Sequence, residues 1–96
     1  MADLVLRSET GRALRPLVEG ALANEPRIID AGIARTAARI EAFEREYGLD
    51  TTTFLERYER GCMAETLDLD EWIGEYRLLA RLREKAETLQ GVRILD

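Results

Sequence analysis

Apolar residues recur every three or four positions along two long segments of the sequence, and this spacing limits the folds that the chain can adopt. In residues 26–47 they are Ile29, Ile33, Ala37, Ile40, Phe43 and Tyr47. In residues 68–90 they are Trp72, Ile73, Tyr76, Leu79, Ala80, Leu82, Ala86 and Leu89. Because an α-helix repeats every 3.6 residues or so, the first set falls on one face of a helix, and the second spreads over more than one narrow seam. The sequence therefore predicts two long helices, the first about 33 Å long at about 1.5 Å per residue.

Residues at the boundaries of the first segment predict where its helix begins and ends. Pro26 suits the first turn of a helix, where its missing N–H is not needed. Gly48 stands where a left-handed residue would end the helix. Asp50 or Thr51 can then cap a short helix, which we expect to stop at Gly61.

The second long helix has the clearest predicted start. Asp68 and Glu71 have the spacing of a capping box, in which two side chains satisfy backbone N–H groups at the helix start. Leu67 before the cap and Trp72 after it can form a hydrophobic staple. Gly91 predicts the end of this helix.

The N-terminal and C-terminal segments leave alternatives open. Residues 4–6, Leu-Val-Leu, suit a short strand or an extended segment. Residues 9–24 have helical spacing, but Pro16 means that a helix either begins near Arg15 or kinks at the proline. The apolar tail at 92–95 can fold back or add an edge strand to a partner.

We predict an all-α fold of one domain, residues 1–96. Its parts are an N-terminal segment and helix (1–24), a long antiparallel helical hairpin with a short intervening helix (26–90), and a tail (91–96). The N-terminal helix would cover one face of the hairpin. Because two helices cannot enclose both apolar faces, we favour a dimer or a hetero-complex that completes a four-helix-type bundle over a monomer.

The composition argues against most catalytic sites. The chain has no histidine and a single cysteine, Cys62, which excludes Cys/His zinc sites, internal disulfides and histidine-based triads. The acidic residues between 65 and 71 lack the spacing of a calcium loop and are better explained by helix capping. Glu41, Glu44 and Glu75 lack the histidine of a carboxylate di-metal site, so we expect solvated side chains. We predict no enzyme activity, no cofactor and no metal.

Charge is distributed unevenly in this acidic chain, whose net charge is −5. Residues 1–40 carry +1, residues 41–70 carry −6, and residues 71–96 are neutral. The acidic middle indicates either a solvated surface or a site for a basic partner. No apolar run is long enough to span a bilayer and no signal peptide opens the sequence, so we expect no membrane partner and a cytoplasmic protein.

Two sets of residues are candidates for binding. Seven apolar residues of the second long helix and tail can contact a protein partner, unless they pack in the core: Trp72, Ile73, Tyr76, Leu79, Leu82, Leu89 and Ile94. Three arginines near the N-terminus can contact DNA phosphates: Arg7, Arg12 and Arg15. A strand followed by helices would suit a homodimeric operator-binding regulator, but residues 4–7 lack the alternating polar pattern of a strand that reads DNA.

Several short motifs between residues 28 and 95 resemble those of a group of small stand-alone bacterial and archaeal proteins. They are Gly32-Ile33-Ala34-Arg35-Thr36, Phe43-Glu44-x-x-Tyr47-Gly48-Leu49, Phe54, Asp68-x-x-x-Trp72, Gly74-Glu75-Tyr76, Leu82-x-x-Lys85 and Leu89. Many members of that group look like antitoxins of toxin–antitoxin pairs. The resemblance implies a helical protein that binds and neutralises a toxin-like partner encoded nearby, with autoregulation by the complex. It implies no catalytic residues.

Overall fold

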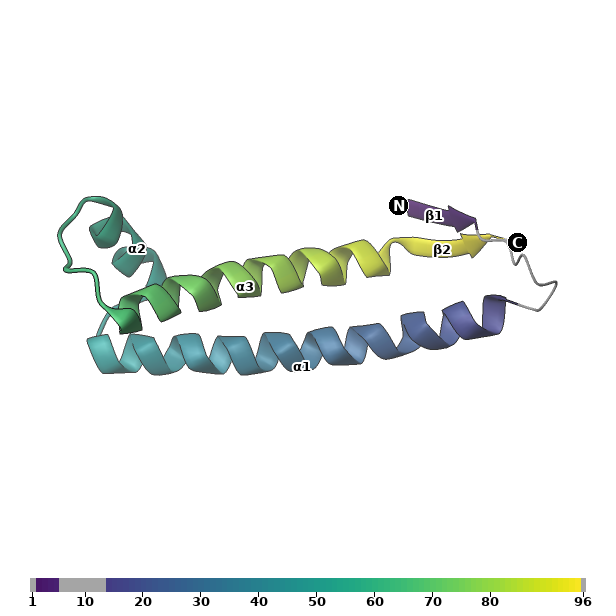
Figure 1. Cartoon of the computed structure of the whole chain (residues 1–96), viewed down its shortest axis with the longest axis horizontal. Helices are drawn as coiled ribbons and strands as arrows, with labels where there is room; N and C mark the ends of the chain where they lie inside the picture. Colours follow the sequence, from purple (N-terminus) through teal and green to yellow (C-terminus); the bar gives the residue numbers. More distant parts are fainter. Residues whose placement is uncertain (1, 6–13, 96) are drawn as a thin grey trace.

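Two long helices lie side by side in opposite directions and give the molecule its rod shape (Figure 1). The structure, a computed structural model, describes residues 2–5 and 14–95. In chain order the described elements are β1 (Ala2–Val5), α1 (Arg15–Tyr47), α2 (Thr51–Glu59), α3 (Leu67–Gln90) and β2 (Val92–Leu95). The rod measures 60 × 22 × 20 Å, with α2 at one end and both strands at the other. The prediction of an all-α hairpin with a short intervening helix is confirmed.

Helix α1 is continuous through Pro26, so the predicted break between separate helices 9–24 and 26–47 is wrong. The alternative in which a helix begins near Arg15 with Pro16 in its first turn is confirmed. Pro26 removes one backbone N–H donor, but helical turns continue on both sides of it, and it lies beside Leu89 at the end of α3. Residues 15–24 therefore lengthen α1 and do not cover a face of the hairpin.

The turn between α1 and α2 follows the sequence prediction. Gly48 has a φ of 65°, in the left-handed region that favours glycine, and its N–H bonds to the carbonyl of Glu44. Asp50 caps α2 by accepting a hydrogen bond from the Thr53 N–H at 2.8 Å. Gly61, with a φ of 72°, follows the end of α2.

Helix α3 starts differently from its prediction. Its N-cap is Thr66, whose hydroxyl accepts a hydrogen bond from the Leu69 N–H at 3.2 Å. Asp68, the predicted cap, lies in the first turn and accepts a hydrogen bond from the Tyr47 hydroxyl at 3.0 Å. Leu67 is 76% exposed, so it forms no staple with the buried Trp72. Helix α3 ends at Gln90, next to Gly91, as expected.

The two chain ends meet in a parallel ladder. Residues of β1 pair with those of β2 in a register that runs from Ala2 opposite Val92 to Val5 opposite Leu95. The tail thus pairs with the N-terminal strand of its own chain, and β2 continues in the direction of α3 (Figure 1). This ladder lies at the end of the rod opposite α2 (Figure 1).

The apolar core is concentrated at the α2 end. Phe54, Leu69 and Trp72 form its buried centre. Along the rest of the hairpin only a thin line of side chains is buried among the described residues, namely Ile29, Thr36, Ile40 and Leu79. The two helices approach closely at Gly32, where an added Cβ would lie 3.3 Å from Leu82. A thin core of this kind leaves the outer faces of both helices uncovered.

Candidate protein-interaction surface

Trp72 is the centre of an aromatic cluster that joins the three helices. Its ring stacks on Phe54 from α2 with a centroid distance of 3.9 Å and an interplanar angle of 10°. Phe43 and Tyr47 from α1 stack on it at 5.7 and 5.8 Å. Stacked aromatic pairs add about 0.5–1.5 kcal/mol to the free energy of burial. The α2 end is therefore the best-packed part of the molecule.

A chain of hydrogen bonds runs through the same region. The Trp72 Nε1–H donates to the Thr51 hydroxyl at 3.0 Å, and that hydroxyl donates to the Glu44 carboxylate at 3.0 Å. The Thr51 backbone N–H donates to the same carboxylate oxygen at 2.8 Å. These bonds satisfy the polar groups that the aromatic cluster buries, and they tie α1, α2 and α3 together. Sequence reasoning missed this network, because Trp72 is 21 residues from Thr51 in the chain and no spacing rule connects the two.

The seven predicted partner-contacting residues divide by burial. Trp72 and Leu79 are core residues, so they support the surface from beneath and are not exposed anchors. Tyr76 is 44% exposed. The others whose side chains are described are half-buried: Ile73, Leu82 and Leu89. Ile94 lies in β2, and its side chain is outside the described part.

Acidic side chains surround the α2 end. Residues 36–75 hold eleven acidic and four basic residues, a net charge of −7. The remainder of the chain holds eight acidic and ten basic residues, a net charge of +2. The exposed acids of the α2 end are Glu41, Glu46, Asp50, Glu56, Glu59, Glu65, Asp70 and Glu71. We call this set the acidic end. Since residues 36–75 lie together toward the α2 end of the rod (Figure 1), the molecule is electrically polar along its length.

A hydrogen bond and desolvation at this end raise the pKa values of two tyrosines. Donation of its hydroxyl to Asp68 raises the pKa of Tyr47 above the ordinary value of 10.0, and desolvation adds to this. Desolvation, followed by the charges of Glu65 and Asp70, raises the pKa of Tyr58. Both hydroxyls are therefore held in the neutral form, which donates hydrogen bonds.

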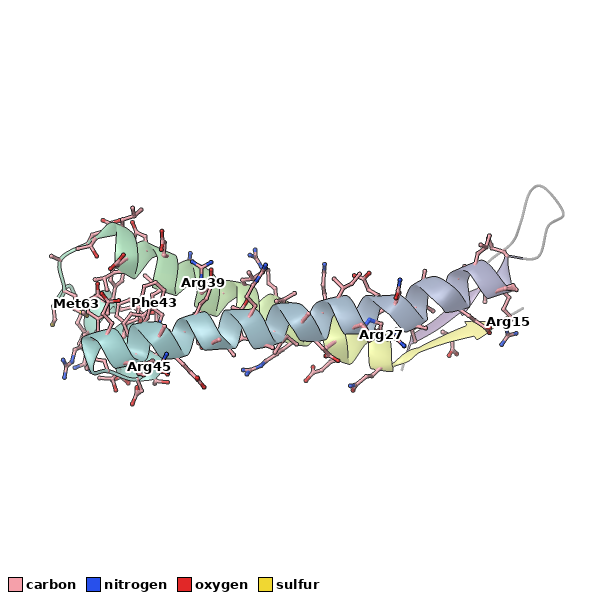
Figure 2. The ribbon with its side chains drawn as sticks, turned by 90° about the horizontal axis from the view of Figure 1, so that it is seen from below. Arg15, Arg27, Arg39, Phe43, Arg45 and Met63 are labelled. Carbon is pink, nitrogen blue, oxygen red and sulfur yellow. The ribbon has the colours of Figure 1, made fainter. Side chains whose placement is uncertain are left out.

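The structure describes one of the three predicted DNA-contacting arginines. Arg7 and Arg12 lie outside the described residues. Arg15 is exposed at the start of α1, where its guanidinium pairs with Glu19 at 2.7 Å (Figure 2). DNA binding by this set stays a prediction.

Within the described residues, no cluster of three or more metal-ligating side chains occurs. Glu44 is bonded to Thr51, Glu75 pairs with Arg39 at 3.4 Å, and Glu41 lies 4.0 Å from Arg45, so the three glutamates have separate partners. Cys62 is exposed, with its Sγ 3.9 Å from a backbone carbonyl. None of the described helices is both long enough and apolar enough to cross a membrane.

A hollow of about 480 Å³ opens between α1 and the C-terminal half of α3. Its apolar floor includes Ile29 and Leu89, and Arg81, Glu84 and Lys85 line its rim. Leu89 is thus the predicted partner residue that lies in a concave part of the surface.

No family model matches this sequence, and comparisons with curated proteins and with solved structures find no significant match. The likeness to antitoxins therefore remains a prediction from the sequence motifs.

Proposed function

We propose that this protein is a non-enzymatic interaction module, antitoxin-like, that binds and neutralises a toxin-like protein encoded beside it. The observation that carries the proposal is the large apolar area left uncovered on a folded rod. On α3, the side chains of Leu67 and Tyr76 are 76% and 44% exposed, although the helix that bears them is well formed. Large exposed apolar side chains on a folded surface mark sites of association.

Toxin binding is placed on the N-terminal half of α3, which lies near α2, and on the acidic end. Tyr76 supplies an exposed aromatic side chain, and aromatic residues dominate binding energies in protein interfaces. Ile73 lies on the same helix and packs against the aromatic core, which holds it in place. The acidic end would attract a basic surface, such as that of a protein that binds or cleaves nucleic acid.

Co-expression with the product of the adjacent reading frame tests the proposal. We expect a soluble complex and relief of any growth arrest that the neighbour causes. Glu56→Lys with Glu59→Lys, both exposed on α2, should slow association about tenfold and weaken its dependence on salt. Glu84→Lys with Glu87→Lys makes the same charge change at the far half of α3 and should leave binding unchanged.

A neighbour that is neither toxic nor bound would end the proposal. Equal effects of the two charge reversals would show that net charge matters and that the acidic end is not the binding site.

A further inference from the structure

Helix α1 carries a second apolar seam beside the one that faces α3. Its members are spaced alternately by four and three residues: Leu17, Ala21, Asn24, Ile28, Ala31, Arg35, Ala38 and Ala42. All eight are exposed, including Leu17 at 72% and Ile28 at 63%. This heptad spacing is that of a helix surface packed against another helix. Figure 2 looks onto the side of α1 away from α3, and no element of the described chain lies across it.

The order of side chains along the seam is self-complementary. If a second α1 runs antiparallel about a two-fold axis between Ile28 and Ala31, each of the two large apolar members faces an alanine, and Ala21 faces Ala38. Leu17 then lies opposite Ala42 and Ile28 opposite Ala31, while Asn24 lies opposite Arg35. Alternation of large and small side chains keeps the helix separation even, and the polar residues are paired with each other.

The surface has a hollow where this register requires one. Ala42 lines a hollow of about 140 Å³ with Arg39, Phe43 and Glu46. Figure 2 shows Arg39 and Phe43 in the half of α1 that lies near α2. A leucine from a facing helix fits such a hollow as a knob enters a hole in a coiled coil. The exposed Leu17 of a second copy lies opposite this position.

The charge distribution favours the same antiparallel arrangement. It places residues 36–75 of each rod, with a net charge of −7, beside the oppositely charged part of the other, whereas a parallel pair would bring the two −7 segments together. A parallel pair would also face Arg35 with the Arg35 of the other copy. On these grounds we propose that the seam binds a second copy of this chain in an antiparallel dimer. The seam itself lies on α1, whereas toxin binding is proposed on α3 and the acidic end, so cross-linking through Leu17 and Ala42 tests the dimer separately from toxin binding.

Disulfide cross-linking tests both the partner and its direction. Leu17 and Ala42 are about 38 Å apart on one helix, so cysteines at these positions cannot bond within a chain. In a Cys62→Ser background, Leu17→Cys with Ala42→Cys should give a covalent dimer on mild oxidation, and Leu17→Cys alone should not. Cross-linking of Leu17→Cys alone to the same extent would overturn the antiparallel register.

Sedimentation equilibrium provides a test without cysteines. We expect the purified chain to have twice the 10.9 kDa mass of one copy, and Ala31→Glu, which places a charge near the two-fold axis, to shift it to one copy. Ala23→Glu is the matched control, since this exposed alanine lies farther round α1 from the seam, and it should remain dimeric. A chain that is monomeric at every concentration, with no cross-linking by the double cysteine variant, would overturn the proposal.

Discussion

Replacing Thr51 by valine tests whether the bonded chain from Glu44 to Trp72 holds the three helices together. Valine has nearly the shape of threonine, so the aromatic cluster keeps its packing while the hydroxyl is lost. The Trp72 N–H then has no acceptor in a fully buried position, and the Glu44 carboxylate loses one of its two Thr51 donors.

The cost of this change follows from the burial. An unsatisfied buried donor costs about 1–3 kcal/mol, and loss of a hydrogen bond to a charged group adds to this. We expect the free energy of unfolding to fall by about 2–3 kcal/mol. For a chain of this size each kcal/mol lowers the melting temperature by about 4–8 °C, so the midpoint should drop by about 8–24 °C.

Urea unfolding provides the assay. Trp72 is the single tryptophan, so its fluorescence reports directly on the cluster, and far-ultraviolet circular dichroism reports on the helices. The midpoints measured by fluorescence and by circular dichroism should shift by the same amount. All variants are compared at one protein concentration, because self-association would make the free energy of unfolding depend on concentration. Thr52→Val is the matched control, since Thr52 is exposed one residue along α2. If Thr51→Val is as stable as Thr52→Val, the network does not contribute as argued.

Four further substitutions have defined expected outcomes. Gly74→Ala should raise the free energy of unfolding by about 1 kcal/mol, because alanine favours a helix and open space surrounds that position in α3. Gly48→Ala should lower the free energy of unfolding by about 1–2 kcal/mol, because φ is positive there. Urea titration measures both changes. Hydrogen bonds from Thr53 lower the pKa of Asp50 below 3.8, so the stabilisation by its carboxylate is complete above that pH and is lost as the pH falls further. Asp50→Asn still caps α2 and should therefore reduce the decline in melting temperature at acidic pH. Because the pKa of Tyr47 is raised above 10.0 in the folded state, its neutral hydroxyl stabilises the fold below pH 10, and this stabilisation is lost as the pH rises further. Tyr47→Phe should therefore reduce the decline in melting temperature at alkaline pH.

Local chemistry in the sequence predicts the turn before α2 correctly. Gly48 and Asp50 act through their own backbone and side chain on residues only three or four positions away. The same local rules gave two wrong predictions. Pro26 has the features of a helix start, but a helix can continue through one missing bond when its turns on both sides are favourable. Asp68 suits a cap, but Tyr47, distant in sequence, bonds it while Thr66 takes the capping position.

Residue spacing along the chain does not predict contacts between residues that are distant in sequence. Parallel pairing of β1 with β2 joins residues about ninety positions apart, and each strand is too short for a clear pattern. Burial of Trp72 was one of two alternatives that the sequence left open, because an apolar stripe can face a core or a partner. The second seam on α1 is present in the sequence, but its exposure becomes evident only once α1 is seen to be one continuous helix.

The central claim, that the uncovered helix faces are interfaces, is tested most directly by sedimentation equilibrium. The mass is measured for the chain alone and for the chain mixed with the product of the adjacent reading frame. The account predicts a mass above 10.9 kDa for the chain alone and a larger one for the mixture. A folded particle of one chain in both samples would contradict it.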